Sequence, residues 1–152
     1  MKWMIIVLLA ALCWNTGCKP TAPEHKPYTS REHGPSTSLI ALIASPESWD
    51  EGDVMVEGFA HFEFEGNCLY LHEDDYRHGI RKNALWVDLP EDLKSHIPTL
   101  NDKYIWVHGT FDAHMIGHGG LNSGGIKDIQ GIGVHDIRDG SEPTKMFEYF
   151  RK

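Results

Sequence analysis

The chain has 152 residues, which is enough for one folded domain once any targeting segment is set aside. Its formal net charge is −8 at pH 7, with 14 Lys and Arg against 22 Asp and Glu. A protein that binds nucleic acid through the phosphates needs a basic stripe, and the sequence has no run of Lys or Arg that could form one. The composition therefore argues against nucleic acid as a partner.

The first 17 residues predict an export signal. Lys2 is followed by an apolar stretch from Met4 to Leu12, and small or polar residues precede Cys18. This stretch is too short for a bilayer core, which needs about 20 apolar residues. We therefore expect a cleaved signal peptide over residues 1–17 rather than a transmembrane helix.

The signal ends in "NTGC", which resembles the lipobox of bacterial lipoproteins, where a lipidated cysteine becomes the mature N-terminus. Thr16, Gly17 and Cys18 match the pattern, and Asn15 stands where a branched apolar residue is usual. Lipidation of Cys18 is expected, with ordinary signal-peptide cleavage as the alternative. Lys19 occupies the place of the aspartate that retains such proteins in the inner membrane. The resemblance implies export and a lipid anchor in the cell envelope, on the outer membrane facing the periplasm if the cell is Gram-negative.

Residues 18–35 are expected to form a proline-rich tether. The stretch contains four prolines and almost no branched aliphatic residue, so it cannot bury enough apolar surface to offset its ordering entropy. The folded domain is expected over residues 36–133, followed by a tail over residues 134–152. In the tail, Phe147, Tyr149 and Phe150 either dock on the domain or bind a partner, and docking is the preferred interpretation.

The folded part is expected to open with a short helix over "LIALI". Ser36 or Thr37 would cap the helix, and Pro46 would end it because helical geometry is disfavoured before proline. A buried strand is the alternative, since periodicity does not separate the two structures in so brief a run.

From Val54 to Glu65 the hydrophobic period changes to two, which predicts a strand. The apolar residues expected on its core face are Val54, Val56, Ala60, Phe62 and Phe64. Gly58 interrupts the strand midway, where a bulge or a sharp coil would let one strand serve two sides of a barrel.

The rest of the domain predicts a mainly β fold. Further strands are expected at residues 68–72, 84–89, 103–113 and 124–132. Between the third and fourth strands, a short helix is expected to begin at Pro90 and to end near Pro98. The order of helix, three strands, helix and two strands is that of the oligonucleotide/oligosaccharide-binding (OB) fold, a five-stranded Greek-key barrel.

Several segments also resemble a family of uncharacterised bacterial OB-type domains that are often exported or lipid-anchored. The segments are "SPESWDEGDVMVEG", "FEFEGNCLYL", "GIRKNALWVDL" and "YIWVHGTFDAHMIGHGGLNSGGIKDI". The resemblance covers residues 39–132. It implies a five-stranded OB-fold-like barrel with a short N-terminal helix, and it implies no activity because the family has no settled one.

The expected fold indicates where a ligand would bind. OB barrels hold ligands across strands two and three, between the loop that joins strands one and two and the loop that joins strands four and five. The candidate ligand-binding residues at these places are Glu65, Asn67, Tyr70, Trp86, His114 and His118. Tyr70 and Trp86 would form a stacking platform, with a core position for one or both as the equal alternative.

The segment "HMIGHGG" places His114 and His118 four residues apart among glycines. A zinc site needs at least three protein ligands, so these two would require a third donor such as His72, His78 or Glu65. The preferred interpretation is a glycine-built connection between strands, in which positive φ angles shape the turn and no metal binds.

Two further features are interpreted as structural. The charged residues 73–82 indicate a solvated loop whose local ion pairs are individually worth little. Cys68 is interpreted as a small buried hydrophobe, since no motif ties it to a catalytic base. The sequence contains no phosphate-binding glycine loop, serine elbow or zinc-protease helix.

These observations favour a non-enzymatic OB-type binding module, held at the envelope by its N-terminal lipid. Its partner would be a small polar ligand, a glycan or an envelope protein, and no cofactor is expected. The alternative is a metal-binding or metal-dependent envelope protein in which His114, His118 and a donor such as His72 hold zinc or another divalent metal. A third hypothesis is a structural envelope component that contacts a partner through its C-terminal tail.

Overall fold

A computed structural model describes residues 36–135 and 148–150 of the chain. The predicted signal peptide, Cys18 and the tether lie outside the described residues, as does most of the predicted tail. Within the described ranges, no helix is both long enough and apolar enough to cross a membrane.

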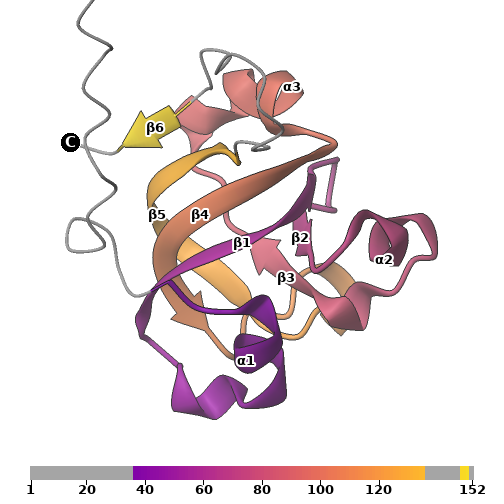
Figure 1. Cartoon of the computed structure of the whole chain (residues 1–152), viewed down its shortest axis with the longest axis vertical. Helices are drawn as coiled ribbons and strands as arrows, with labels where there is room; N and C mark the ends of the chain where they lie inside the picture. Colours follow the sequence, from indigo (N-terminus) through magenta and orange to yellow (C-terminus); the bar gives the residue numbers. More distant parts are fainter. Residues whose placement is uncertain (1–35, 136–147, 151–152) are drawn as a thin grey trace, which may run out of the picture.

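The described chain forms a closed five-stranded barrel (Figure 1). Its strands are β1 (Asp53–His61), β2 (Cys68–Tyr70), β3 (Ala84–Val87), β4 (Lys103–Asp112) and β5 (Gly125–Val134). β1 pairs with β2 and β4, β5 pairs with β4, and a parallel pairing of β3 with β5 closes the barrel. This order confirms the predicted OB-fold-like barrel.

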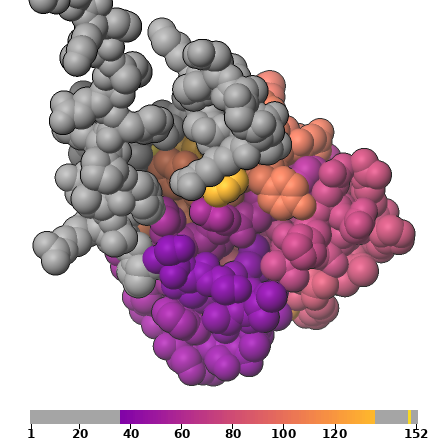
Figure 2. Space-filling model, viewed as in Figure 1, coloured from indigo at the N-terminus to yellow at the C-terminus, as the bar shows by residue number. Residues whose placement is uncertain are grey.

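Helical segments cover the two ends of the barrel and part of its outer surface. They are α1 (Leu39–Ala44), η1 (Pro46–Ser48), α2 (Glu73–Arg77), η2 (Arg81–Asn83), η3 (Glu91–His96), α3 (Ile97–Leu100) and η4 (His118–Gly120). α1 and α3 lie at opposite ends in Figure 1, and each end contributes buried leucines to the core. α1 also contacts η2, and Figure 2 shows the N-terminal helix packed beside the β2–β3 connection on one face.

The predicted first helix is confirmed, but its cap is Ser38 rather than Ser36 or Thr37. The Ser38 Oγ accepts a hydrogen bond from the Ile40 amide at 3.2 Å. Ser36 bridges to Met55 in β1, and the Thr37 amide donates to the Met55 carbonyl at 2.8 Å. The two earlier residues are thus held in extended backbone beside β1, so the helix begins only after them.

β1 ends earlier than the strand that the alternating pattern predicted. The strand ends at His61, and a turn follows in which the Gly66 amide donates to the Glu63 carbonyl at 3.1 Å. Phe64 lies in this turn and is 92% exposed, so its predicted place on the core face is wrong. The alternating pattern still holds at Phe62, just after β1, and it fails inside the turn.

Gly58 is a point of close approach rather than a bulge. The pairing of β1 with β4 runs through it in unbroken register. A Cβ at Gly58 would lie 2.6 Å from the Tyr70 carbonyl oxygen of β2. The absence of a side chain therefore lets β1 approach β2 where it changes from one side of the barrel to the other.

The predicted helix between β3 and β4 consists of two helical segments, η3 and α3. Pro98 lies in the first turn of α3, which ends at Leu100, so the prediction that the helix ends near Pro98 is confirmed. Proline is tolerated there because the amides of a first turn have no partner within the helix. Leu93 and Leu100 from the two segments are buried in the barrel core.

The β2–β3 connection contains the helical segments α2 and η2, whereas the sequence predicted a loop; the predicted local ion pair forms between Glu73 and Arg77 on its surface. Asp75 in α2 is buried; its carboxylate accepts hydrogen bonds from Asn83 Nδ2 at 2.8 Å and from the His72 amide at 3.2 Å. These bonds fold the connection back on itself, and they place α2 against the outer surface of the barrel.

A sixth strand, β6 (Glu148–Phe150), pairs antiparallel with β5. The Tyr149 hydroxyl donates to Asp92 Oδ2 at 2.7 Å, and its ring is partly buried against the core. The tail thus docks on the barrel at this strand, as preferred from the sequence, and Phe147 lies outside the described residues.

A second, smaller apolar cluster covers the outer face of β1, β2 and β3. Its buried members are Phe59, Cys68, Tyr70 and Ala84, with Tyr76 and Trp86 partly buried against them. This is the face across which OB barrels hold ligands. Side chains of the protein itself therefore fill much of that face, and among the described residues a pocket opens at one end of it.

Candidate functional site

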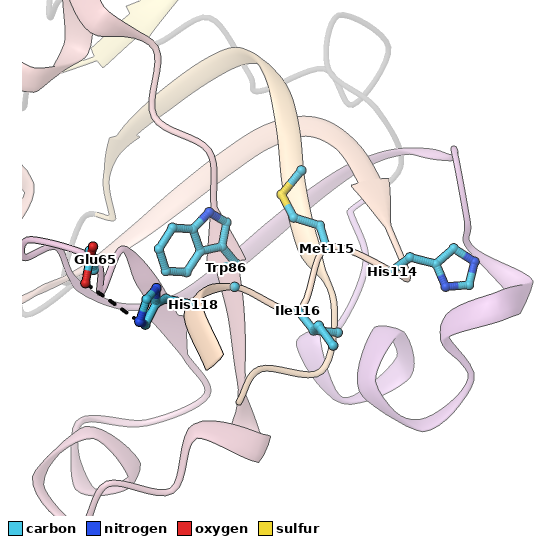
Figure 3. A pocket seen from close by; sticks show the side chains of 7 residues that line it. Glu65, Trp86, His114, Met115, Ile116 and His118 are labelled. Carbon is cyan, nitrogen blue, oxygen red and sulfur yellow. Dashed lines mark ion pairs between the residues drawn. The ribbon is translucent and has the colours of Figure 1, made fainter. Parts of the chain in front are cut away.

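An open pocket of about 520 Å³ lies at that end, beside Trp86 of β3 (Figure 3). Its other lining residues come from the turn between β1 and β2 and from the connection between β4 and β5: Glu65, His114, Met115, Ile116, Gly117 and His118. Four predicted candidates, Glu65, Trp86, His114 and His118, therefore line one pocket.

Trp86 is half-buried and held from two sides. Its ring packs against the smaller apolar cluster, and its amide donates to the Gly124 carbonyl at 2.9 Å. A Cβ on Gly117 would lie 2.5 Å from Cε3 of the indole, so the Gly117 backbone rests against the ring. Trp86 is thus a fixed wall of the pocket rather than a mobile side chain.

Tyr70 does not join Trp86 in a stacking platform. It is only 3% exposed, and its ring centroid lies 5.6 Å from that of Tyr76. Tyr76 belongs to α2, which the sequence did not predict and which packs on the same face. Burial raises the pKa of Tyr70 to about 12. Tyr70 is therefore a core residue, which was the alternative left open by the sequence. Of the two, Trp86 alone faces the pocket.

Glu65 reaches the pocket from a turn in an unfavourable backbone conformation. Its φ of +58° lies in the left-handed region, which costs a residue with a side chain about 1 kcal/mol or more. Its Oε2 lies 3.7 Å from Nε2 of His118, so the two loops meet across the mouth of the pocket (Figure 3). Both side chains are more than half exposed, which makes the pair weak even when His118 is protonated.

Asn67 takes a different place from the one predicted. It is half-buried and is not among the residues that line the pocket. Its carbonyl accepts a hydrogen bond from the Val87 amide at 2.9 Å. Asn67 therefore extends the pairing of β2 with β3 through its backbone.

The β4–β5 connection is held firmly at its start. Asp112 Oδ1 accepts hydrogen bonds from the amides of His114 at 2.9 Å and Met115 at 3.0 Å. Lys127 Nζ donates to Asp112 Oδ2 at 2.8 Å, and this bond is the main cause that lowers the pKa of Asp112. The carboxylate thereby positions the first two pocket residues of the connection.

The far end of the connection is docked on η2. Lys82 Nζ donates to the carbonyls of Gly120 at 3.4 Å and Asn122 at 3.3 Å. The Ser123 hydroxyl donates to the Lys82 carbonyl at 2.9 Å. Asn122 is buried, and its Nδ2 donates to Cys68 Sγ at 3.3 Å.

Two sequence interpretations of this region are confirmed. Gly117, Gly119 and Gly120 have positive φ angles of 66°, 71° and 69°, as expected of a glycine-built connection. Cys68 is fully buried, and burial raises the pKa of its thiol. A protonated, inaccessible thiol is a poor nucleophile.

The histidines of the described residues do not assemble a metal site. His114 points away from His118 in Figure 3 because the glycine-rich backbone turns between them. Over residues 36–135 and 148–150, no group of three or more His, Cys, Asp and Glu side chains is placed to hold a metal ion. His72 precedes α2 and does not line the pocket, so the predicted set of His114, His118 and His72 is not brought together.

Met115 and Ile116 form much of the apolar lining, and the sequence reasoning overlooked them. The signal was present, because two large apolar residues stand in a glycine-rich loop with no strand or helix period to bury them. Ile116 is 43% exposed in the structure.

Fold and site together define an OB-fold-like barrel with an open, largely apolar pocket between two loops. Comparison with known proteins adds no relative: no family model, curated protein or solved structure matches the chain. The resemblance to exported OB-type domains therefore stays a prediction.

Proposed function

We propose that this protein is a non-enzymatic binding module whose pocket receives an apolar side chain from a partner polypeptide. The observation that carries the proposal is the half-buried indole of Trp86, which lines a pocket with Met115 and Ile116. The pocket lies beside the ligand face of OB barrels and between the two loops that flank it.

The chemistry of the lining favours a polypeptide over a sugar or a small polar ligand. Sugar hydroxyls need several fixed hydrogen-bonding groups, and the polar side chains that line the pocket belong to Glu65, His114 and His118, all exposed. Large apolar side chains are also exposed in the two loops that flank the pocket. Phe64 is 92% exposed and Leu121 is 47% exposed, in the same two loops. Apolar patches with a polar rim are typical of protein interaction sites.

The lipobox resemblance supports a place for this module in the cell envelope. With Cys18 lipidated, the proline-rich residues 19–35 would hold the barrel away from the membrane surface. The proposed partner is then an envelope protein.

The test is selection of a random dodecapeptide phage library against the full chain. We expect peptides with a large apolar residue, which perturb the NMR signals of Trp86 and Met115. Ile116→Ser should weaken their binding about 10-fold, because it removes part of the buried apolar surface. The matched control is Ile40→Ser, since Ile40 is 58% exposed on α1 and should not affect binding. Failure to select any peptide, or equal effects of the two variants, would overturn the proposal.

A further inference from the structure

We infer that the partner segment carries Lys or Arg next to its apolar anchor, and this inference rests on the proposed function. Its first support is the charge of the domain. Residues 36–135 contain six Lys and Arg against 16 Asp and Glu, a formal charge of −10. An anionic segment would be repelled by this field, and a cationic one would be attracted.

The second support is the local distribution of charge at the pocket. The two loops that flank it, residues 62–67 and 113–124, contain no Lys or Arg. Two cations from outside the loops contact them and are thereby engaged within the protein: Arg81 lies 3.6 Å from Glu63, and Lys82 donates to two loop carbonyls. The pocket therefore offers an incoming anion no unengaged guanidinium or ammonium group from these loops.

Glu65 is the carboxylate that meets an incoming cation. It lines the mouth, and its partner across the mouth, His118, is a histidine at 3.7 Å that competes for it only when protonated. A Lys or Arg side chain can lay its apolar stem along Ile116 and the Trp86 ring while its head reaches Glu65. Arg can bind a carboxylate through two parallel hydrogen bonds.

The backbone of Glu65 is an independent observation. Its φ of +58° favours glycine, yet the position holds a charged side chain beside the pocket. Residues kept in such conformations cluster at binding sites, where the surrounding structure maintains them. The turn at Glu65 is thus kept in an unfavourable backbone conformation beside the pocket, as expected if the Glu65 side chain contacts a ligand.

The test uses the tightest phage-selected peptide in three synthetic forms, with Lys, Ser or Glu on both sides of its apolar anchor. Fluorescence anisotropy gives the dissociation constants with the full chain at low and high salt. We expect the Lys form to bind about 10-fold more tightly than the Glu form at low salt, with a smaller ratio at high salt.

Variants of the protein locate the effect. Glu65→Gln should remove most of the preference for Lys. The matched control is Glu57→Gln, because Glu57 is also an exposed glutamate beside a histidine, 3.5 Å from His135, and lies outside the pocket. That variant should keep the preference.

Each other outcome has a definite meaning. Equal binding of the three forms, tighter binding of the Glu form, or a preference that survives Glu65→Gln overturns this inference and leaves the apolar pocket standing. If no selected peptide depends on Ile116, the proposed function fails and this inference fails with it.

Discussion

At the scale of single residues, the pocket depends on the contact between Gly117 and Trp86. The glycine has a φ of +66°, and a Cβ there would overlap the indole at 2.5 Å. Backbone conformation and steric fit thus both require glycine at this position. Gly79 has the same backbone conformation without the steric contact, so a comparison of the two positions separates the two effects.

We expect Gly117→Ala to destabilise the protein more than Gly79→Ala. Gly79 has the same φ of +66° with nothing within 4 Å of its missing Cβ, so alanine there should cost only the conformational term, about 1–2 kcal/mol. At Gly117 displacement of the ring should add about 1–3 kcal/mol. Urea unfolding of both variants, followed by tryptophan fluorescence, measures the difference. Equal losses would mean that Trp86 moves aside freely.

Tyr70 should make stability fall at high pH. Its pKa is about 12 in the folded protein, against about 10 for an unperturbed tyrosine. The unfolded chain therefore releases this proton first as pH rises, and the free energy of unfolding should fall between pH 10 and pH 12. Chemical denaturation of the wild type and of Tyr70→Phe across this range tests the point. If both proteins lose the same stability, Tyr70 is not the cause.

At the scale of elements, the β4–β5 connection is positioned by Asp112. The Lys127 hydrogen bond lowers the pKa of this carboxyl, so its contribution to stability is present above the usual carboxyl pKa near 4 and is lost as pH falls through the lower folded value. The amide shifts of His114 and Met115 should follow that titration in NMR spectra, with an apparent pKa below 4. An apparent pKa at or above 4 would show that the Lys127 contact does not persist in solution.

The same element shows how far sequence reasoning reached. Glycine spacing predicted the positive φ angles, and the order of strands placed the connection beside the ligand face. The side-chain contacts of Lys82 and Asn122 were not predictable, because each joins residues that are distant in the sequence.

The helix α2 could not be predicted from the sequence. Residues 73–77, "EDDYR", contain one large apolar residue, so no helical period reveals them. The segment folds because Asp75 accepts hydrogen bonds from Asn83 and His72. Because α2 was not foreseen, Tyr70 could not be assigned to the core. Alternation did predict four of the five core-face residues expected between Val54 and Glu65, and it failed at Phe64 inside the turn that follows β1.

At the scale of the whole molecule, the barrel is covered on several sides by its own chain. α1 and α3 lie at its two ends, α2 lies against its outer face, and β6 extends its sheet beyond β5 (Figure 1). The pocket beside Trp86 lies open between the two loops that flank it.

Truncation after Gly140 should lower the melting temperature and promote self-association. It removes β6 together with the hydrogen bond from Tyr149 to Asp92, and it leaves the edge of β5 that faces away from β4 unpaired over residues 131–133. Unpaired strand edges are templates for association. Thermal unfolding and analytical ultracentrifugation measure the two effects, with Tyr149→Phe separating the hydrogen bond from the strand. An unchanged, monomeric truncated protein would assign β6 no structural role.

Trp86 also belongs to the strand pairing that closes the barrel. β3 and β5 pair through two residue pairs, Trp86↔Gly125 and Val87↔Ile126, fewer than any other pairing of the sheet. The pocket thus lies directly on the narrowest seam of the fold. A partner residue bound against Trp86 would link the two strands at this pairing. The free energy of unfolding should therefore rise as more of the pocket is occupied.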